Sequence, residues 1–302
     1  MTPQMPAGFA ARPPRPDDVA AVTAVIAAGE RDAHGVVDIV EEDVRSDWRR
    51  PSFDLAADAI VVTADSGVVA YAEELAGRAH VWVHPSVTGL GIGTALLGWT
   101  EDHAQRTGAP DVGQTLSEHQ GAARRLLSAR GYVTGWVSWI FQLPLDRAAP
   151  APAPPGIRLR GLRRPDDERT AYEVIEAAFA PWPGRRPVPF DDWVAAHLDR
   201  RDADPDLVIL AEDAGRVVGA AVSLVYDDEG WVEQLAVAAS HRGRGVGRAL
   251  LGAAFAEFRR RGLRTAGLST DSRTGARGLY EQVGMQVLRS YTRFTRTLLR
   301  QP

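Results

Sequence analysis

The sequence predicts two tandem domains of the α/β class (α+β, with a mixed sheet), each sheet covered by helices. The first observation is length, since 302 residues suffice for two domains of roughly 100–200 residues. The second is an internal repeat, because one order of apolar patterns occurs twice, roughly 150 positions apart. The third is segment 148–155, which contains only Ala and Pro and favours an extended spacer. We expect domains at 1–148 and 156–302 and a linker at 149–155, with the boundary near Pro150.

Each domain is expected to begin with a helix followed by a hairpin. The tetrapeptide Arg-Pro-Asp-Asp precedes a helical pattern in both halves, and Asp at a helix start caps free amides and suits the helix dipole. Two apolar runs around a Gly-containing turn then predict a hairpin. The helices are expected at 19–28 and 170–180, and the hairpins at 59–72 and 207–225.

A further strand, a Gly-rich turn and a second helix follow in each half. The helices are predicted at 94–105 and 248–261. Each half then ends in the order strand, helix, strand, and Gly131 and Gly284 follow the last helix as C-caps. Strands that alternate with helices in this order favour a mixed sheet covered by helices.

Composition excludes several classes of protein. The chain is 45% hydrophobic and 25% charged, as in an ordinary soluble protein, and its net charge of -4 argues against nucleic-acid binding. The longest apolar-leaning stretch, 19–29, is about half of the ~20 residues that a membrane span needs. The first 18 residues lack the pattern of a secretory signal. We expect a cytoplasmic monomer or homodimer without membrane or nucleic-acid partners.

The Gly-rich turn of the second half is suited to an anion. Glycines allow successive N–H groups to face one point, and the helix start adds positive charge, which together suit a pyrophosphate. An NAD site is excluded because arginines at 259–261 stand where an acidic residue is needed, and a Walker A loop because the chain has no Lys. The turn consists of Arg242, Gly243, Arg244, Gly245, Val246, Gly247 and Arg248.

This turn resembles the acetyl-CoA loop of the GNAT acyltransferase superfamily, Arg/Gln-x-x-Gly-x-Gly/Ala, which follows a strand ending in apolar-x-Val. A second motif, 279–285, resembles the family's Leu-Tyr-Glu-x-x-Gly-Phe. The resemblance covers nearly all of 156–302 and, more weakly, 1–147. It implies two tandem GNAT-like domains and transfer of an acyl group from acetyl-CoA to a primary amine of a small molecule. The alternatives are a non-catalytic acyl-CoA-binding module and a protein or peptide N-acetyltransferase.

The resemblance also implies how acetyl-CoA is held. The amides of 243–248 would bind the pyrophosphate, and the strand before them would hydrogen-bond the pantetheine arm like an added strand. Arg273 stands close to the position of a family Asn and is expected to make a weak phosphate contact. The strand residues implied are Leu235, Ala236 and Val237.

Acyl transfer needs a base for the amine and an acid for the leaving thiolate. Tyr280 matches a family Tyr whose hydroxyl lies near the CoA sulfur, although such a Tyr also packs in a core. Glu233 lies where some members place a catalytic base, and a carboxylate in a partly dry cleft has a raised pKa. Its alternatives are binding of a cationic substrate or a solvated position. Strand alternation places Trp231, Glu233, Leu235 and Val237 on one face.

The acceptor site is expected to involve segment 180–193, which includes Trp182 and Phe190, together with Trp231. The alternative is a surface loop whose aromatic residues pack in the core. Acidic residues at 227–229 and 233 favour a cationic amine. No metal is expected, because the chain has no Cys and its His residues are scattered.

The first half is predicted to be degenerate. It keeps the glycines of the turn but loses the side chains to which we assign chemistry. The layout is similar to that of a two-domain member of the superfamily whose C-terminal half carries the activity. Thr88, Leu90, Thr94, Ala79 and Leu127 stand where the second half has Arg242, Arg244, Arg248, Glu233 and Tyr280.

Overall fold

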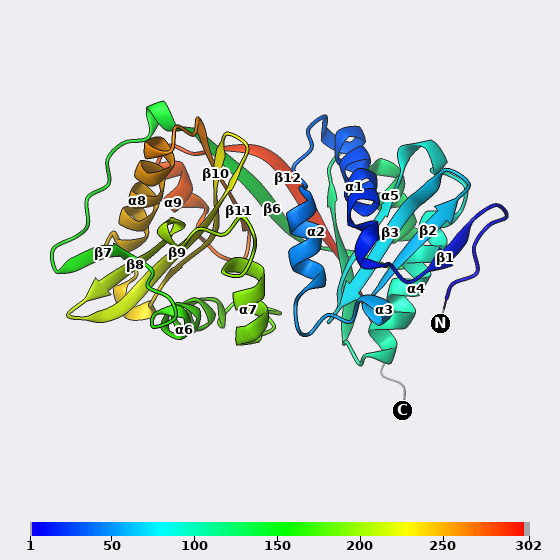
Figure 1. Ribbon diagram of the computed structural model, residues 1–302, viewed down its shortest axis with the longest axis horizontal. Helices are drawn as coiled ribbons and strands as arrows, with labels where there is room; N and C mark the ends of the chain where they lie inside the picture. The colour runs from blue at the N-terminus through cyan, green and yellow to red at the C-terminus, as the bar shows by residue number, and fades with distance from the viewer. Residues whose placement is uncertain (1, 299–302) are drawn as a thin grey trace. The chain divides into compact units, whose positions relative to one another are not determined.

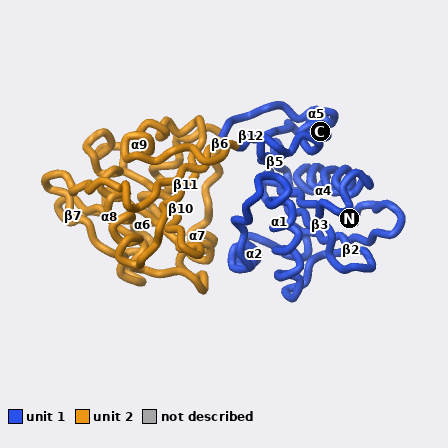
Figure 2. The backbone as a smooth tube through the Cα atoms, turned by 90° about the horizontal axis from the view of Figure 1, so that it is seen from above, with its two compact units in different colours: residues 1–137, 291–302 blue, residues 138–290 orange. Residues whose placement is uncertain are grey.

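The computed structural model describes residues 2–298. The backbone divides into two compact units, which are coloured separately in Figure 2. The first unit contains residues 1–137 and 291–302, and the second contains residues 138–290. Each unit has a mixed sheet between helices, as Figure 1 shows, so the predicted fold class is confirmed.

The first unit has helices on both faces of its sheet. Its strands are β1 (Ala10–Arg12), β2 (Ala59–Ala64), β3 (Gly67–Leu75), β4 (Arg78–Val83), β5 (Asp111–Ser117) and the end of β12 (Gln286–Thr297), in that order across the sheet. Its helices are α1 (Val19–His34), α2 (Glu41–Trp48), α3 (Leu55–Asp58), α4 (Ile92–Arg106) and α5 (Gly121–Ala129). Neighbouring strands are antiparallel except β4 and β5. Apolar clusters join α1 and α2 to one face and α4 and α5 to the other.

The second unit repeats this arrangement. Its strands are the end of β6 (Val133–Pro144), β11 (Thr265–Asp271), β10 (Glu229–Val237), β9 (Arg216–Tyr226), β8 (Val208–Asp213) and β7 (Ile157–Gly161), in that order. Its helices are α6 (Glu168–Phe179), α7 (Phe190–His197), α8 (Val246–Arg260) and α9 (Arg277–Gln282). Only β10 and β11 are parallel neighbours among these strands. Helices α8 and α9 cover one face, and α6 and α7 the other.

The last strand of each half completes the sheet of the other unit, which the sequence did not predict. Strand β6 begins in the first unit, but residues 138–144 pair with β11 of the second. Strand β12 begins in the second unit, but residues 291–297 pair with β5 of the first. We had expected the two units to divide at the Ala/Pro segment. They divide instead within β6 and within β12, because each half contributes the end of its last strand to the other unit.

The Ala/Pro segment is packed against α8 and is not the free spacer that its composition suggests. A Cβ added at Gly252 of α8 would lie 2.6 Å from the Cβ of Ala151, so only Gly permits this approach. The guanidinium of Arg259 donates to the carbonyl of Ala148 at 2.9 Å. The segment thus covers part of the outer surface of α8.

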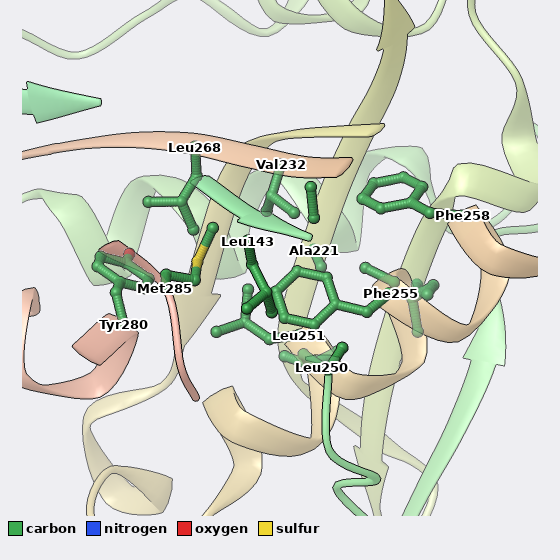
Figure 3. Packing of buried hydrophobic residues seen from close by; sticks show 14 of the residues in the cluster. Leu143, Ala221, Val232, Leu250, Leu251, Phe255, Phe258, Leu268, Tyr280 and Met285 are labelled. Carbon is green, nitrogen blue, oxygen red and sulfur yellow. The ribbon is translucent and has the colours of Figure 1, made fainter. Parts of the chain in front are cut away.

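The α8 face of the second unit contains a large apolar cluster, part of which is shown in Figure 3. Phe258 of α8 is buried, and a Cβ added at Gly230 of β10 would lie 2.2 Å from its ring. This close contact fixes the start of β10 against the helix. Because β10 leads to the Gly-rich turn, the same packing positions the candidate site.

The strand exchange predicts which engineered cysteines will pair. Asp111 is the register partner of Thr297, and Thr265 is the partner of Pro144. Since the chain has no Cys, the double variant D111C/T297C has one possible disulfide, and cross-strand partners are close enough to form it. We expect this variant to oxidise within monomeric chains, as seen by peptide mass mapping.

The matched control is D111C/P144C. Pro144 occupies in β6 the place that Thr297 occupies in β12, so these cysteines meet only if each half keeps its own last strand. A crosslink in this control, and none in D111C/T297C, would contradict the exchange.

Candidate active site

The parallel strands β10 and β11 are paired over only part of their length. Their pairing ends at Val232 opposite Leu268, although β10 continues to Val237 and β11 to Asp271. Within the described chain, no strand pairs with the edge of 233–237 that faces β11. This edge offers backbone N–H and C=O groups to an extended ligand, as in addition of a β-strand.

A β-bulge interrupts β10 at the same place. Its pairing with β9 steps from Val232 opposite Ser223 to Gln234 opposite Val222, so Glu233 is the extra residue. A bulge turns the inserted side chain away from the regular alternation and shifts the faces of the residues that follow. The side chain of Glu233 is exposed.

The bulge shows that the shared face expected for Trp231, Glu233, Leu235 and Val237 is wrong. Leu235 and Val237 pack against the α8 cluster, whereas Gln234 between them and the bulge accepts a hydrogen bond from α7 at 2.8 Å. Trp231 precedes the bulge beside Val232, which faces α8, so the indole lies on the opposite face. Period-two alternation fails here because one residue has been inserted.

Trp231 and Glu233 nevertheless meet. The indole Nε1–H of Trp231 donates to Oε2 of Glu233 at 2.7 Å. The indole also covers the backbone of β11, because a Cβ added at Gly267 would lie 2.6 Å from the ring. The bulge and this hydrogen bond together hold the Glu233 carboxylate beside the point where the strands separate.

The Gly-rich turn begins α8 with the backbone that an anion site requires. Gly243 and Gly245 have φ of +71° and +83°, in the left-handed region that favours Gly. Helix α8 starts at Val246, and the first turn of a helix leaves amide N–H groups without intrahelical acceptors. A Cβ added at Gly247 would contact Val237 at 3.7 Å, so the turn lies close to the end of β10.

The arginines of the turn differ in what they contact. The guanidinium of Arg242 donates to the carbonyls of Val237 at 3.2 Å and Ala178 at 2.9 Å, so it ties the turn to β10 and α6. Arg244 lies 3.9 Å from a carboxylate oxygen of Asp213, and both Arg244 and Arg248 are exposed. Within the described chain, neither donates to a backbone carbonyl as Arg242 does, so both can add positive charge at the outer surface of the turn.

Arg273 is engaged by the protein. Its guanidinium forms an ion pair with Asp271 at 2.6 Å and donates to the carbonyl of Pro183 at 2.8 Å. It thereby joins the end of β11 to the loop between α6 and α7. The phosphate contact that we expected of Arg273 stays a prediction, and these contacts favour a role in holding the loop.

His241 supports the turn in a way that the sequence did not reveal. Its Nε2 lies 2.9 Å from a carboxylate oxygen of Asp213, and its Nδ1 lies 2.9 Å from the hydroxyl of Ser240. No local pattern indicates its partner, because Asp213 belongs to the hairpin that precedes β10 and is distant in sequence.

Tyr280 of α9 lies in the apolar cluster on the α8 face, as Figure 3 shows. It is 7% exposed, and its ring centroid lies 5.6 Å from that of Phe141. Burial raises the pKa of the Tyr280 hydroxyl to about 12, while a side-chain hydrogen bond with Thr270 of β11 lowers it. The phenol therefore keeps its proton at neutral pH.

The segment between α6 and α7 is fastened to the unit at several points. Trp182 is half-buried and stacks on Phe179 at 4.4 Å between ring centroids. Phe190 lies in α7, and the guanidinium of Arg169 covers its ring at 3.5 Å. Trp182 is thus near the loop surface, whereas Phe190 belongs to the packing between the two helices.

A charged side chain of this segment and two acidic residues near the start of β10 also have partners within the unit. Arg185 forms an ion pair with Glu176 of α6. Among the acidic residues expected at the entrance, Asp228 forms an ion pair with Arg264, and Glu229 accepts a hydrogen bond from Gln142 at 2.8 Å. The structure therefore brings Trp231 and Glu233 together, while these other charges serve contacts of their own.

The first unit has the same turn, but the strand that precedes it, β4, differs from β10 in its pairing. Gly89 and Gly91 have φ of +79° and +90°, and α4 begins after them as α8 does. Strand β4, however, pairs with β3 in unbroken register and has no bulge in the described chain. Ala79 and Leu127, at the positions matched to Glu233 and Tyr280, are buried apolar side chains.

The described residues contain neither a metal-binding cluster nor a membrane-spanning helix. Over residues 2–298 there is no group of three or more His, Asp or Glu side chains arranged to hold a metal ion. No helix in the same range has both the length and the apolar character needed to cross a membrane.

Comparison with known proteins identifies the family. The acetyltransferase (GNAT) family matches residues 35–132 and 168–285, one region in each half. The mycothiol acetyltransferase of Thermobispora bispora is 32% identical over 246 residues, covering 74% of this chain and 78% of that protein. The mycothiol acetyltransferase of Geodermatophilus obscurus is 29% identical over 299 residues, covering 89% and 91%.

Solved structures show the same likeness over the whole chain. A GCN5-related N-acetyltransferase from Sphaerobacter thermophilus is 34% identical with a TM-score of 0.78, covering 97% of both chains. A tandem GNAT protein from the clavulanic acid biosynthesis pathway shares the fold at 16% identity, with a TM-score of 0.73 and coverage of 97% and 99%. The chain therefore belongs to the GNAT family of acetyl-CoA-dependent N-acetyltransferases, as a tandem of two such domains.

Proposed function

We propose that the second unit transfers the acetyl group of acetyl-CoA to a primary amine of a small molecule by direct attack. The observation that supports this most strongly is the coincidence, at one end of β10, of an open strand edge, a Gly-rich turn and a bulged carboxylate. Each of these features serves a different part of the reaction. Most of the rate enhancement comes from holding amine and thioester together.

The donor is held by backbone groups. The open edge of 233–237 hydrogen-bonds the pantetheine arm, and the amides of 243–248 receive the pyrophosphate at the start of α8. Arg244 and Arg248 add positive charge at the exposed side of the turn. Arg242 acts on the turn itself, through its contacts with the carbonyls of β10 and α6.

Glu233 is the base in this proposal. An amine attacks a thioester only when it is neutral, so a proton must leave the nitrogen. Glu233 accepts this proton directly or through water, and Trp231 fixes the orientation of the carboxylate through the 2.7 Å hydrogen bond. The bulge supports this role because it places the side chain at the separation of the strands rather than in either core.

Tyr280 is the acid. The departing thiolate of CoA needs a proton, and a phenol whose pKa is about 12 remains protonated at neutral pH. The hydroxyl lies beside Thr270, which is two residues beyond the last paired residue of β11. This location on the separated part of β11 supports access to the sulfur of a donor bound along β10.

The first unit keeps the turn but not the chemistry. Its strand lacks the bulge, and buried apolar side chains replace both the base and the acid. We propose that this unit has a supporting rather than a catalytic role. Its glycines have the same backbone conformation as those of the second unit. The same substitution can therefore be made in either turn, and its effect on acetyl-CoA binding can be compared between the two units.

The acceptor is proposed to be a small molecule rather than a protein. Relatives named mycothiol acetyltransferase at 32% and 29% identity favour this class. These relatives are only about 30% identical to the chain, so we do not transfer their substrate to it. The exposed carboxylate of Glu233 would attract a cationic amine, which favours screening aminoglycosides, polyamines and peptide N-termini.

Removal of the base should slow the reaction strongly. E233Q keeps an oxygen that accepts from the Trp231 indole but cannot take a proton, so we expect kcat/KM to fall ~10²–10⁴-fold. Release of free thiol from acetyl-CoA with the best amine of the panel measures this. The control is E229Q on the same strand, for which we expect less than a ~3-fold change. An unchanged rate in E233Q would remove Glu233 from the mechanism.

Acetyl-CoA should bind with a stoichiometry of one per chain. G245V and G91V make the same change at equivalent turns, since both glycines have positive φ and precede a helix. Because a side chain is strained there, we expect calorimetric titration to show loss of binding in G245V and normal binding in G91V. Two sites, one lost in G91V, would show that the first unit also binds the donor. No binding by the wild type at millimolar ligand would argue against the proposed reaction.

Tyr280 should make the protein less stable at alkaline pH. Its pKa is about 12 in the folded chain against about 10 when unfolded, so only the unfolded state loses this proton between those values. Stability is therefore full below pH 10 and falls as pH rises toward 12. From pH 9 to pH 11, urea unfolding should show a loss about 1 kcal/mol larger in the wild type than in Y280F. Equal losses would mean that Tyr280 is not buried as described.

A further inference from the structure

We propose that His241, held by Asp213, is a positioning residue that orders the Gly-rich turn of the second unit for the pyrophosphate of acetyl-CoA. This inference rests on the proposed binding of the donor at that turn. It makes the part of the donor affinity that comes from the pyrophosphate depend on one hydrogen bond between distant segments. The turn cannot order itself, because Gly243 and Gly245 have a backbone freedom that other residues lack.

Asp213 gives the turn a fixed partner in the sheet. It is the last residue of β8 and has register partners on both sides, Ile157 of β7 and Arg216 of β9. One of its carboxylate oxygens lies 2.9 Å from Nε2 of His241. A residue paired on both edges moves little, so a contact with this carboxylate restricts the segment that makes it.

The imidazole of His241 has a contact at each nitrogen. A carboxylate only accepts hydrogen bonds, so Nε2 carries the hydrogen that Asp213 receives. In the neutral ring, Nδ1 then accepts from the hydroxyl of Ser240, which lies 2.9 Å away. The His241 side chain is only 14% exposed, and a hydrogen bond that is shielded from water is stronger than one at the open surface.

His241 and Arg242 fasten the turn to different parts of the unit. His241 ends the short helix η5 (Ala239–His241), which joins β10 to the turn. Arg242 donates to carbonyls of β10 and α6, whereas His241 reaches the end of β8. The chain is therefore held at two consecutive residues immediately before Gly243. Amides that are ordered before binding reduce the entropy that is lost when an anion binds.

The same hydrogen bond leaves Arg244 available to the donor. Nη1 of Arg244 lies 3.9 Å from the Asp213 oxygen that His241 contacts, which is too far for a hydrogen bond. Because His241 already donates to that oxygen, Arg244 can turn toward a phosphate without leaving the carboxylate unsatisfied. Without the imidazole, Asp213 would attract Arg244, and the turn would lose positive charge as well as order.

The first unit offers an internal comparison. Val87 stands at the position of His241, and Asp65 stands in the hairpin at the position of Asp213. Val87 packs against an apolar cluster of the first unit. The first unit thus keeps the acidic residue and lacks the imidazole. This difference is expected if the hydrogen bond serves donor binding, because the first unit also lacks the candidate base and acid.

The test is calorimetric titration of the full chain with acetyl-CoA. H241L and D213L each remove one side of the hydrogen bond, and we expect the Kd to rise ~10- to 100-fold in either variant. The double variant H241L/D213L should bind no more weakly than either single variant, because both changes remove the same interaction. D213N keeps an oxygen that accepts from the imidazole and should bind within ~3-fold of the wild type.

The matched control is H84L in the first unit. Nδ1 of His84 lies 2.7 Å from the hydroxyl of Ser86, which is the counterpart of Ser240. H84L therefore makes the same chemical change beside the other turn, and we expect its Kd for acetyl-CoA to equal that of the wild type. Equal weakening in H84L and H241L would overturn the proposal.

A truncated donor separates positioning from a general loss of structure. S-acetylpantetheine has the reacting thioester and the pantetheine arm but no pyrophosphate. With the best amine of the panel, we expect H241L to lower kcat/KM ~10- to 100-fold for acetyl-CoA, through KM, and less than ~3-fold for S-acetylpantetheine. Equal losses with both donors would mean that His241 has only a structural role.

Two further outcomes overturn the proposal. If H241L binds acetyl-CoA as tightly as the wild type while G245V does not, the turn binds the donor without help from His241. If the losses in H241L and D213L add in the double variant, the two side chains act independently. Absence of binding by the wild type would instead overturn the donor site itself, and the inference with it.

Discussion

The end of the pairing between β10 and β11 is the constraint on which the site depends. Two parallel strands that remained paired to their ends would satisfy their own backbone groups and leave none for a ligand. Here pairing stops at Val232 and Leu268, while β10 continues beside β9. The bulge at Glu233 occurs at the same point, so one irregularity both exposes a backbone edge and places a carboxylate beside it. The contact of Gly230 with Phe258 holds the preceding residues in place.

Several charged side chains near the site support the backbone rather than face outward. Arg242 donates to carbonyls of β10 and α6, and Arg273 joins Asp271 to the loop at Pro183. A guanidinium has donors in a planar fork, and carbonyl oxygens at the ends of strands and helices are acceptors that need partners. The turn and the loop between α6 and α7 are therefore both held by arginines.

The two units show what a GNAT fold keeps when the side chains at two candidate catalytic positions differ. Both have the positive-φ glycines, because the strand-to-helix turn requires them whatever else the unit does. The first unit lacks the bulge of β10, and apolar side chains occupy the positions of Glu233 and Tyr280. An apolar residue at those positions improves packing and removes the cost of a buried polar group. The glycines that the turn requires are thus different residues from those at the two candidate catalytic positions.

The sequence by itself determined the fold class, the repeat, the hairpins and the Gly-rich turns, because alternation, Gly placement and capping are local. It did not determine that β6 and β12 are exchanged, since either strand presents a suitable apolar pattern to either sheet and only the whole chain decides between them. It placed Trp231, Leu235 and Val237 on one face, because a one-residue bulge is not visible in an alternating pattern. It also could not connect His241 with Asp213, because hydrogen bonds between distant segments exist only once the strands and helices have packed.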